Sequence, residues 1–119
     1  MKIMIVDDEP TILLSLSHLL SNKETTVITC SRIEEAEEAL ARDAFDLVIA
    51  DIRLSGMYGT EGLELLSFIK KMHVDTPVII MTAHGTDEIK EEAYKRGAFH
   101  YYEKPIDITD LISKVQAVI

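Results

Sequence analysis

Thiols and long apolar runs are scarce in this 119-residue sequence. Cys30 is the only cysteine, so no internal disulfide can form, and we expect it to be a small apolar residue ending a strand. No apolar run approaches the roughly 20 residues that a membrane-spanning helix needs. A signal-peptide pattern is also missing, because Lys2 is the only cation before the apolar stretch ends at Asp7. We therefore expect a cytoplasmic protein that does not cross a membrane.

Positive charge is also in short supply. The sequence has 12 lysine and arginine residues against 21 aspartate and glutamate residues, which gives a formal net charge of −9 at pH 7. Affinity for the phosphates of DNA or RNA comes mainly from lysine and arginine. The balance therefore argues against direct nucleic-acid binding by this domain, although a partner or a neighbouring domain that binds nucleic acid stays open.

Ligands for zinc are scarce as well. The single cysteine and the four histidines have no metal-ligand spacing. We expect His18 and His73 at the surface, and His84 at the border of the site described below.

No internal repeat, low-complexity segment or linker divides the chain. Its length is typical of one domain, and its 47% of hydrophobic residues can fill one core. We predict a single domain over residues 1–119, and whether it was cut from a longer multidomain protein stays open.

What the sequence does have is a regular alternation of short apolar segments and helical patterns. The apolar segments predict strands over residues 2–6, 25–30, 45–51, 76–83 and 98–103. Apolar residues at helical spacing predict helices over residues 10–20, 31–43, 61–72, 86–97 and 107–119. Strands that are apolar almost throughout are typical of a parallel sheet with helices on both faces. We therefore predict an α/β fold with a doubly wound parallel sheet.

Some helix ends have recognisable signals. Ser31, followed three residues later by Glu34, matches a capping box at the start of the second helix. Thr86 or Asp87 is predicted to cap the fourth helix, and Gly97 is predicted to end it.

Reactive side chains follow the predicted carboxyl ends of the strands, which is where open α/β sheets bind ligands. The members of this set are Asp7, Asp8, Asp51, Thr82 and Lys104. Each has an ordinary explanation alone, since aspartate after a strand is usually a turn residue or a helix cap. Together they are hard to attribute to chance, because every charged member falls at a strand end on one side of the sheet.

The three aspartates predict a Mg²⁺ site, because this ion prefers a few carboxylates together with water and phosphate. A divalent ion would also offset the repulsion between Asp7, Asp8 and Asp51. One carboxylate would then be able to act as a nucleophile and form an acyl-phosphate. Thr82 could hydrogen-bond a phosphoryl oxygen, and Lys104 could place a positive charge near another.

The chain resembles the receiver domain of a two-component response regulator. The matching segments are VDDE after the first strand, DLVIAD in the third, IIMTA in the fourth and GAFHYYEKP around the fifth. The resemblance covers the chain from Lys2 to the last helix, and the set of motifs in this order is specific. It implies a flavodoxin-like (βα)5 sheet with the strand order 2-1-3-4-5.

The resemblance implies a role for each matching residue. Asp51 would accept a phosphoryl group from the phosphohistidine of a sensor histidine kinase or a phosphotransfer protein. Thr82 and Lys104 would bind the phosphoryl oxygens. The domain would be a signalling switch that catalyses its own phosphoryl transfer and slow dephosphorylation, rather than a turnover enzyme. The Mg²⁺ ligands would be Asp7, Asp8, Asp51 and the backbone carbonyl of Arg53.

The resemblance also implies a switch. Tyr101 matches the family's switch aromatic, and Lys104–Pro105 matches a peptide bond that is cis in such domains. On phosphorylation, Thr82 would move toward the phosphoryl group and Tyr101 would rotate into the vacated space. The fourth helix, fifth strand and fifth helix would then present a remodelled face to an effector domain or to a second copy. Tyr102 is expected in the core on the opposite face of the sheet.

The fourth helix, over residues 86–97, is the least apolar of the predicted helices, and weak packing makes an element easier to shift. Its expected buried residues are Ile89, Ala93 and Tyr94. The same pattern also fits an ordinary solvated surface helix.

The sequence departs from the family pattern after Asp51. Ser55 stands where the family commonly has proline, and the segment that follows is longer than usual. Arg53 and His84 match positions that border the path of the attacking water in such domains. We expect these side chains either to shield the acyl-phosphate or to point to solvent.

Three other interpretations fit parts of the pattern. A small Mg²⁺-dependent aspartyl phosphatase would usually have a second aspartate where this sequence has Arg53, and would need a cap segment. An interaction module that is never phosphorylated would be expected to lack one of the site residues, and all are present. A flavin-binding domain needs a phosphate-binding loop after the first strand, whereas DDEPT is acidic and lacks glycine.

Overall fold

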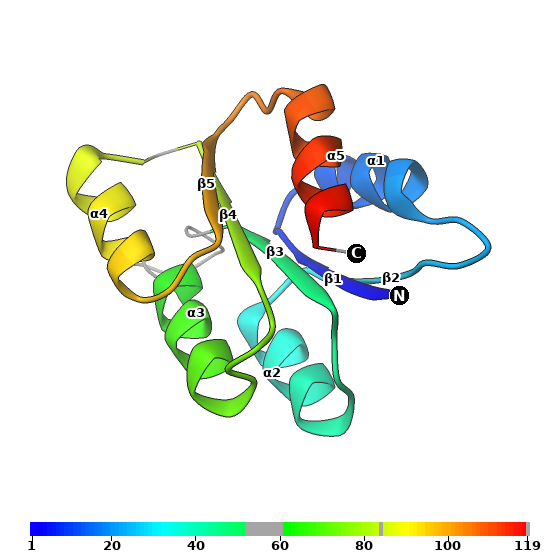
Figure 1. Cartoon of the computed structure of the whole chain (residues 1–119), viewed down its shortest axis with the longest axis horizontal. Helices are drawn as coiled ribbons and strands as arrows, with labels where there is room; N and C mark the ends of the chain where they lie inside the picture. Colours follow the sequence, from blue (N-terminus) through cyan, green and yellow to red (C-terminus); the bar gives the residue numbers. More distant parts are fainter. Residues whose placement is uncertain (52–60, 84, 119) are drawn as a thin grey trace.

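Strands and helices alternate along the chain, as the hydrophobic pattern predicts. The structure is a computed structural model that describes residues 1–51, 61–83 and 85–118. The strands are β1 (Lys2–Val6), β2 (Thr26–Cys30), β3 (Leu47–Asp51), β4 (Val78–Thr82) and β5 (His100–Glu103) (Figure 1). The helices are α1 (Pro10–Leu20), α2 (Ile33–Arg42), α3 (Glu61–Met72), α4 (Asp87–Lys95) and α5 (Ile108–Ala117).

All neighbouring strands are parallel, and their order is β2-β1-β3-β4-β5. This confirms the predicted α/β fold and strand order. The register aligns the carboxyl ends: Val6 of β1 pairs with Ala50 of β3, and Asp51 pairs with Met81 of β4. Residues that directly follow these strands therefore meet at one edge of the sheet.

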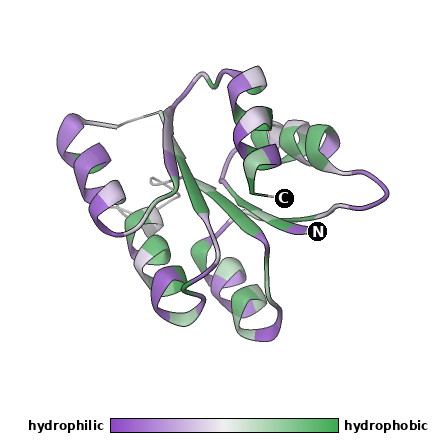
Figure 2. Ribbon diagram, viewed as in Figure 1, coloured by the Kyte–Doolittle hydropathy of each residue, from purple (hydrophilic) through white to green (hydrophobic). Residues whose placement is uncertain are grey.

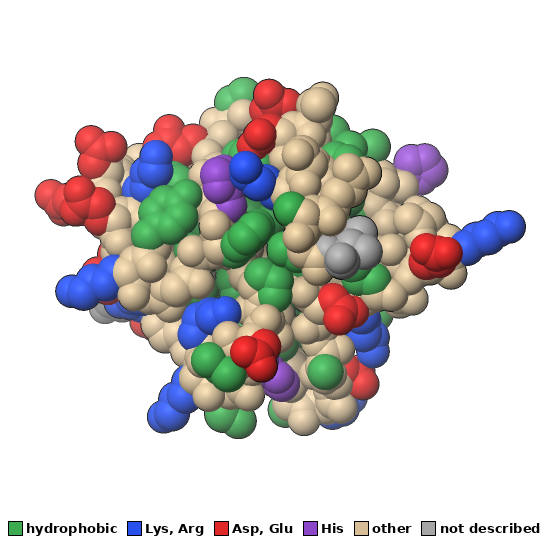
Figure 3. Space-filling view, viewed as in Figure 1, with side chains coloured by type: hydrophobic (Ala, Val, Ile, Leu, Met, Phe, Trp, Pro, Cys, Tyr) green, Lys and Arg blue, Asp and Glu red, His purple; other side chains and the backbone are tan. Residues whose placement is uncertain are grey.

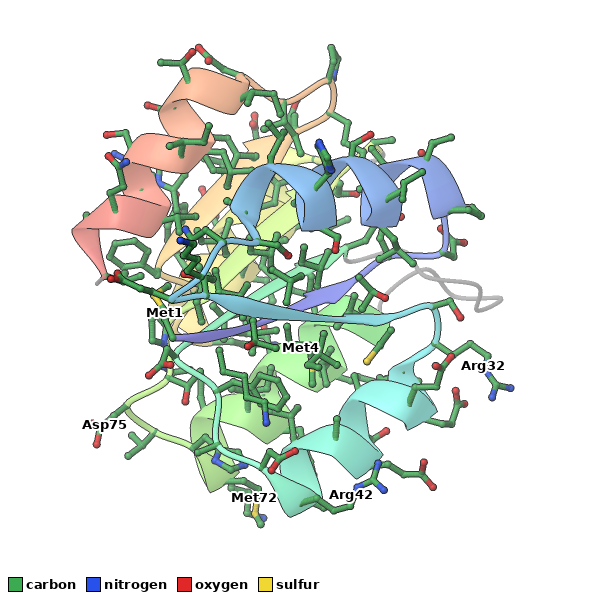
Figure 4. The ribbon with its side chains drawn as sticks, turned by 90° about the vertical axis from the view of Figure 1, so that its right-hand side faces the viewer. Met1, Met4, Arg32, Arg42, Met72 and Asp75 are labelled. Carbon is green, nitrogen blue, oxygen red and sulfur yellow. The ribbon has the colours of Figure 1, made fainter. Side chains whose placement is uncertain are left out.

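Helices cover both faces of the sheet, with α1 and α5 on one side and α2, α3 and α4 on the other (Figures 1 and 4). Successive strand residues point to opposite faces, so β1 contributes Ile3 and Ile5 to one core and Met4 and Val6 to the other. Figure 4 shows Met4 directed toward the layer of α2 and α3.

Burial on both faces explains why the central strands contain no polar alternation. Figure 2 shows these strands as strongly hydrophobic, whereas α4 is mostly hydrophilic. In the described part of the chain, no helix has the length and hydropathy needed to span a bilayer.

The ends of α4 agree with the sequence, whereas its buried face is narrower than predicted. The Thr86 hydroxyl accepts a hydrogen bond from the Ile89 amide at 3.1 Å, which confirms Thr86 as the N-cap. Gly97 follows the helix with a φ of 105°, a conformation that favours glycine. Ala93 is buried and Ile89 is half-buried, but the prediction for Tyr94 is wrong because 41% of this residue is exposed.

The capping box predicted at the start of α2 does not form. The helix begins at Ile33, so Arg32 is the N-cap and makes no side-chain capping bond. Ser31 lies one residue too early, and its hydroxyl donates to the carboxylate of Glu35 at 2.9 Å instead.

The predicted surface position is confirmed for His18, whereas His73 is only partly exposed. The His73 ring is part-buried, and its Nε2 donates to the backbone carbonyl of Leu40 at 2.9 Å. Cys30 is buried at the end of β2, as expected. Burial, with a further contribution from the charge of Glu35, raises the pKa of its thiol to about 11.

Replacing a core leucine should cost far more stability than replacing a surface one. Leu66 is fully buried in α3, and Leu66→Ala should lower the free energy of unfolding by about 2 to 5 kcal/mol because it leaves a cavity. Leu14 of α1 is 73% exposed, so the matched Leu14→Ala change should stay within about 0.5 kcal/mol. Urea unfolding measures both, and equal costs would contradict this assignment of the core.

Candidate functional site

Three aspartate side chains converge at the carboxyl edge of the sheet. Asp7 directly follows β1, and Asp51 is the last residue of β3, the neighbouring strand. With Asp8, each offers a carboxylate oxygen, and these oxygens all lie within 4.8 Å of one another. Asp7 and Asp51 are buried, while Asp8 is exposed. The predicted cluster is therefore present.

The backbone holds Asp7 in place. Its amide donates to the Cys30 carbonyl at 3.0 Å, which continues the pairing of β1 with β2 by one residue. Its carboxylate accepts a hydrogen bond from the amide of Glu9 at 2.9 Å, a local turn that aspartate favours. Asp7 is thus fixed before any ligand binds.

Lys104 brings a positive charge to the carboxylates from the far end of the sequence. Its Nζ donates to Asp7 at 2.8 Å and to Asp51 at 3.1 Å, and its side chain is only 9% exposed. The Lys104 amide donates to the carbonyl of Thr82 at 2.8 Å, which ties this segment to the end of β4. The peptide bond that joins Lys104 to Pro105 is cis, as the resemblance implies.

The ionisation of Lys104 is set by two opposing effects. Burial on its own would lower its pKa, because a charged group loses its hydration. The hydrogen bond to Asp7 and the charge of Asp51 outweigh burial, so the pKa lies above its ordinary value of 10.5. Lys104 is therefore charged at neutral pH and neutralises part of the acidic cluster.

The remaining charge makes this cluster suitable for a divalent cation. Three carboxylates and one ammonium leave a net negative charge at one edge of the sheet. Carboxylate oxygens are hard ligands that suit Mg²⁺, whereas zinc sites are usually built from cysteine and histidine. The residues present therefore fit Mg²⁺. The predicted carbonyl ligand from Arg53 lies outside the described residues, as do Ser55 and His84.

The two predicted switch residues lie on adjacent strands. Thr82 ends β4 at the same edge as Asp51 and is 1% exposed. Tyr101 of β5 lies with its ring inside the core on the α4 side, and Tyr102 lies on the opposite face, as predicted. The Tyr101 ring already lies inside the core in this structure. Its rotation on phosphorylation stays a prediction.

Two features of the site could not be predicted from the pattern. The Glu9 carboxylate lies 3.4 Å from the Nζ of Lys104. The only sequence signal for this contact is that Glu9 directly follows Asp7 and Asp8. Gly85, in the connection between β4 and α4, directly borders the hydroxyl of Tyr101. A glycine between a strand and a helix is common, so the sequence contains no signal for this contact.

A groove of about 450 Å³ opens beside Lys104. Its walls come from α1 and from the segment between β5 and α5, and they include Ile12, Ser15, Leu16, Pro105 and Ile106. Most of the lining residues are apolar, and Glu9 and Lys104 are the charged members.

Comparisons with known proteins agree with these observations. A family model described as the response regulator receiver domain matches residues 3–116. The DNA-binding transcriptional regulator NtrC of Escherichia coli is 39% identical over 117 residues, which are 98% of this chain and 24% of that protein. The response regulator protein PilR of Pseudomonas aeruginosa is 38% identical over 107 residues, 90% of this chain and 23% of that protein. The chain thus spans about a quarter of the length of these relatives.

Solved structures are also similar. The beryllofluoride-activated NtrC4 receiver domain dimer superposes with a TM-score of 0.88 at 27% identity, covering 98% of this chain and 94% of that one. The beryllofluoride-activated DrrB receiver domain has a TM-score of 0.87 at 29% identity, covering 98% and 95%.

Removing the Lys104 charge should strongly destabilise the protein in metal-free buffer. Lys104→Met leaves Asp7 and Asp51 buried together, and we expect a loss of about 3 to 5 kcal/mol in the free energy of unfolding. Because the pKa of Lys104 is raised in the folded state, its contribution is fully present below pH 10.5 and disappears only as the pH rises through the higher folded-state value.

Lys2→Met is the matched control, because the Lys2–Asp43 pair is exposed and should cost about 0 to 1 kcal/mol. Urea unfolding at pH 7 and pH 9 measures both variants. A similar small cost at the two positions would show that the buried ion pair does not stabilise the fold.

Proposed function

Since this chain belongs to the response regulator receiver family, we propose that Asp51 accepts a phosphoryl group from a phosphohistidine on a partner protein. Receiver domains of response regulators act in phosphorylation-dependent signalling and pair with histidine kinases. The observation that carries the proposal is the buried Asp51 carboxylate, which lies 3.1 Å from Lys104 within a cluster that also contains Asp7 and Asp8. We further propose that residues 1–119 act as one such domain.

The proposed transfer moves the phosphoryl group from nitrogen to oxygen. A carboxylate oxygen of Asp51 attacks phosphorus while the bond from phosphorus to the imidazole nitrogen breaks, and the imidazole keeps the electron pair. Lys104 shifts from the carboxylate to a phosphoryl oxygen, and the Thr82 hydroxyl donates to another. Mg²⁺, held by Asp7, Asp8 and Asp51, would neutralise charge on the phosphoryl oxygens when bound.

We propose that the groove beside Lys104 is where a donor protein docks to reach Asp51. We propose that an apolar side chain of the donor enters between α1 and the segment after β5, which would bring its phosphohistidine to the acidic edge. A bulky side chain that fills this groove should therefore slow phosphoryl transfer from protein donors but not from small-molecule donors. Ser15 lines the groove and belongs to neither the metal cluster nor the phosphoryl-binding residues.

We expect Ser15→Trp to accept phosphoryl groups from acetyl phosphate at the wild-type rate and from a phosphohistidine protein more slowly. A small donor needs no docking, whereas a protein donor does. Rates of adduct formation with the two donors, measured by intact-mass spectrometry, test this. Equal slowing with both donors, or none with either, would show that the groove is not the docking route.

We propose that the output passes through the face formed by α4, β5 and α5. Acidic side chains gather over α4 (Figure 3), and Tyr94 and Phe99 are exposed by 41% and 43%. Exposed tyrosine and phenylalanine side chains are enriched in protein–protein interfaces, whose rims are polar. The occupant would be an effector domain or a second copy, and sedimentation before and after phosphorylation would distinguish a second copy.

Incubation with acetyl phosphate and Mg²⁺ should add one phosphoryl group to the protein. Intact-mass spectrometry detects this adduct, and it should be absent from Asp51→Asn, which lacks the nucleophile. Chelation of the metal with EDTA, or Asp8→Asn, should strongly reduce its formation, because the charge on the phosphoryl oxygens is then not offset.

A beryllofluoride titration would detect a site whose acyl-phosphate is too short-lived for mass analysis. No response in either experiment would favour the interaction module that is never phosphorylated. An adduct that forms equally well without Mg²⁺ would remove the role proposed for the aspartate cluster.

A further inference from the structure

The hydroxyl of Tyr101 is a buried polar group without a hydrogen-bond partner among the described residues. The residue is only 6% exposed, so water does not reach this group freely. Tyr102, the next residue, differs: its hydroxyl donates to the carboxylate of Asp110. An unpaired buried hydroxyl costs free energy, so something else must favour the inward position of the Tyr101 ring.

The space for this hydroxyl comes from Gly85. A Cβ atom at this position would lie 1.8 Å from the Tyr101 Oη and 3.1 Å from its Cζ. It would also lie 3.0 Å from the Cγ2 of Thr82. Separations below 3.0 Å are essentially never seen for a real Cβ. The ring can therefore occupy its inward position only because residue 85 has no side chain.

The backbone does not require glycine at this position. Among the described glycines only Gly97 has a positive φ, so Gly85 has a conformation that other residues can adopt. What residue 85 must provide is room, and the atom that needs this room is the end of the Tyr101 side chain.

We propose that Gly85 is a positioning residue that permits the inward position of Tyr101 by leaving space for its hydroxyl. The proposal rests on the proposed function and on the switch that the family resemblance implies for Thr82 and Tyr101. A side chain at position 85 would drive the ring out toward the face formed by α4, β5 and α5, opposite to the inward rotation predicted on phosphorylation.

Opposing free energies make the ring position sensitive to one methyl group. Inside, the ring packs in the core against which Ile89 and Ala98 also pack, but its hydroxyl finds no hydrogen-bond partner in the part of the chain that the structure describes. Outside, the hydroxyl reaches water and the apolar contacts are lost. Where two states are closely balanced, a small change in shape can move the population from one to the other.

Charge on Tyr101 does not disturb this balance at neutral pH. Burial raises the pKa of its hydroxyl, and the charges of Glu103 and Asp87 raise it further. The group therefore stays neutral, and shape and hydrogen bonding decide where the ring lies.

The test is a double-mutant cycle on unphosphorylated protein, with Gly85→Ala, Tyr101→Phe and the double variant. Gly85→Ala alone should lower the urea midpoint, because the new methyl group displaces the ring. In the Tyr101→Phe background the loss should be smaller or absent, because the hydroxyl that the methyl group meets is gone. Tyr102→Phe is the matched control, and in that background Gly85→Ala should cost as much as in the wild type.

A spectroscopic measurement separates displacement of the ring from a general loss of stability. The sequence has four tyrosines, so a 3-fluorotyrosine-labelled protein should give four ¹⁹F signals, and Tyr101→Phe identifies the one from Tyr101. Gly85→Ala should move this signal toward the shift and narrow line of an exposed tyrosine. It should leave the Tyr102 signal in place.

Each outcome of these two experiments either supports or overturns the proposed role of Gly85. A Tyr101 signal that does not move in folded Gly85→Ala, or an equal loss of stability in all three backgrounds, would overturn the role of Gly85. If Gly85→Ala does not fold, recovery in the double variant supports the proposal, and failure of both overturns it. Absence of an adduct on Asp51 would instead overturn the proposed function, and because the cycle uses unphosphorylated protein its outcome would still be interpretable.

Discussion

The ion pair that joins Lys104 to Asp7 and Asp51 is the interaction on which the rest of the site depends. Parallel pairing of β1 with β3 forces two buried carboxylates together, and their repulsion must be offset before the edge can fold. Lys104 comes from 97 residues away from Asp7 and 53 residues away from Asp51, so the tertiary fold must assemble before this charge arrives. One ammonium offsets part of this repulsion but leaves the edge acidic, which suits it to a divalent cation.

The parallel sheet is what makes such an edge possible. Because helices cover both faces, polar side chains cannot lie along the central strands without losing hydration, and they collect where the strands end. The register then brings the ends of β1, β3 and β4 side by side. Burial of Asp7 and Asp51 follows from the same arrangement, and it strengthens their interaction with Lys104 because the surroundings are less polar than water.

Tyr101 and Tyr102 are neighbours on one strand, but different contacts hold their side chains in place. They point to opposite faces of β5, as neighbouring strand residues must. Tyr102 has a hydrogen bond to Asp110, which holds β5 against α5. Tyr101 has none among the described residues, and its place depends on the space at Gly85. A side chain held by shape alone can change position more readily than one held by shape and a hydrogen bond.

The sequence alone determined the elements, the order of the sheet through its family motifs, and the positions of Asp7, Asp8, Asp51, Thr82 and Lys104 at one edge. These features are local or periodic: burial on two faces leaves apolar runs, and strand ends are visible where those runs stop. The tertiary structure decided what depends on distances between segments far apart in the chain. The contact of His73 with Leu40, the exposure of Tyr94 and the place of Gly85 beside Tyr101 are of this kind. A missing side chain leaves no pattern in the sequence, and its effect is visible only once the atom that fills its space has been placed.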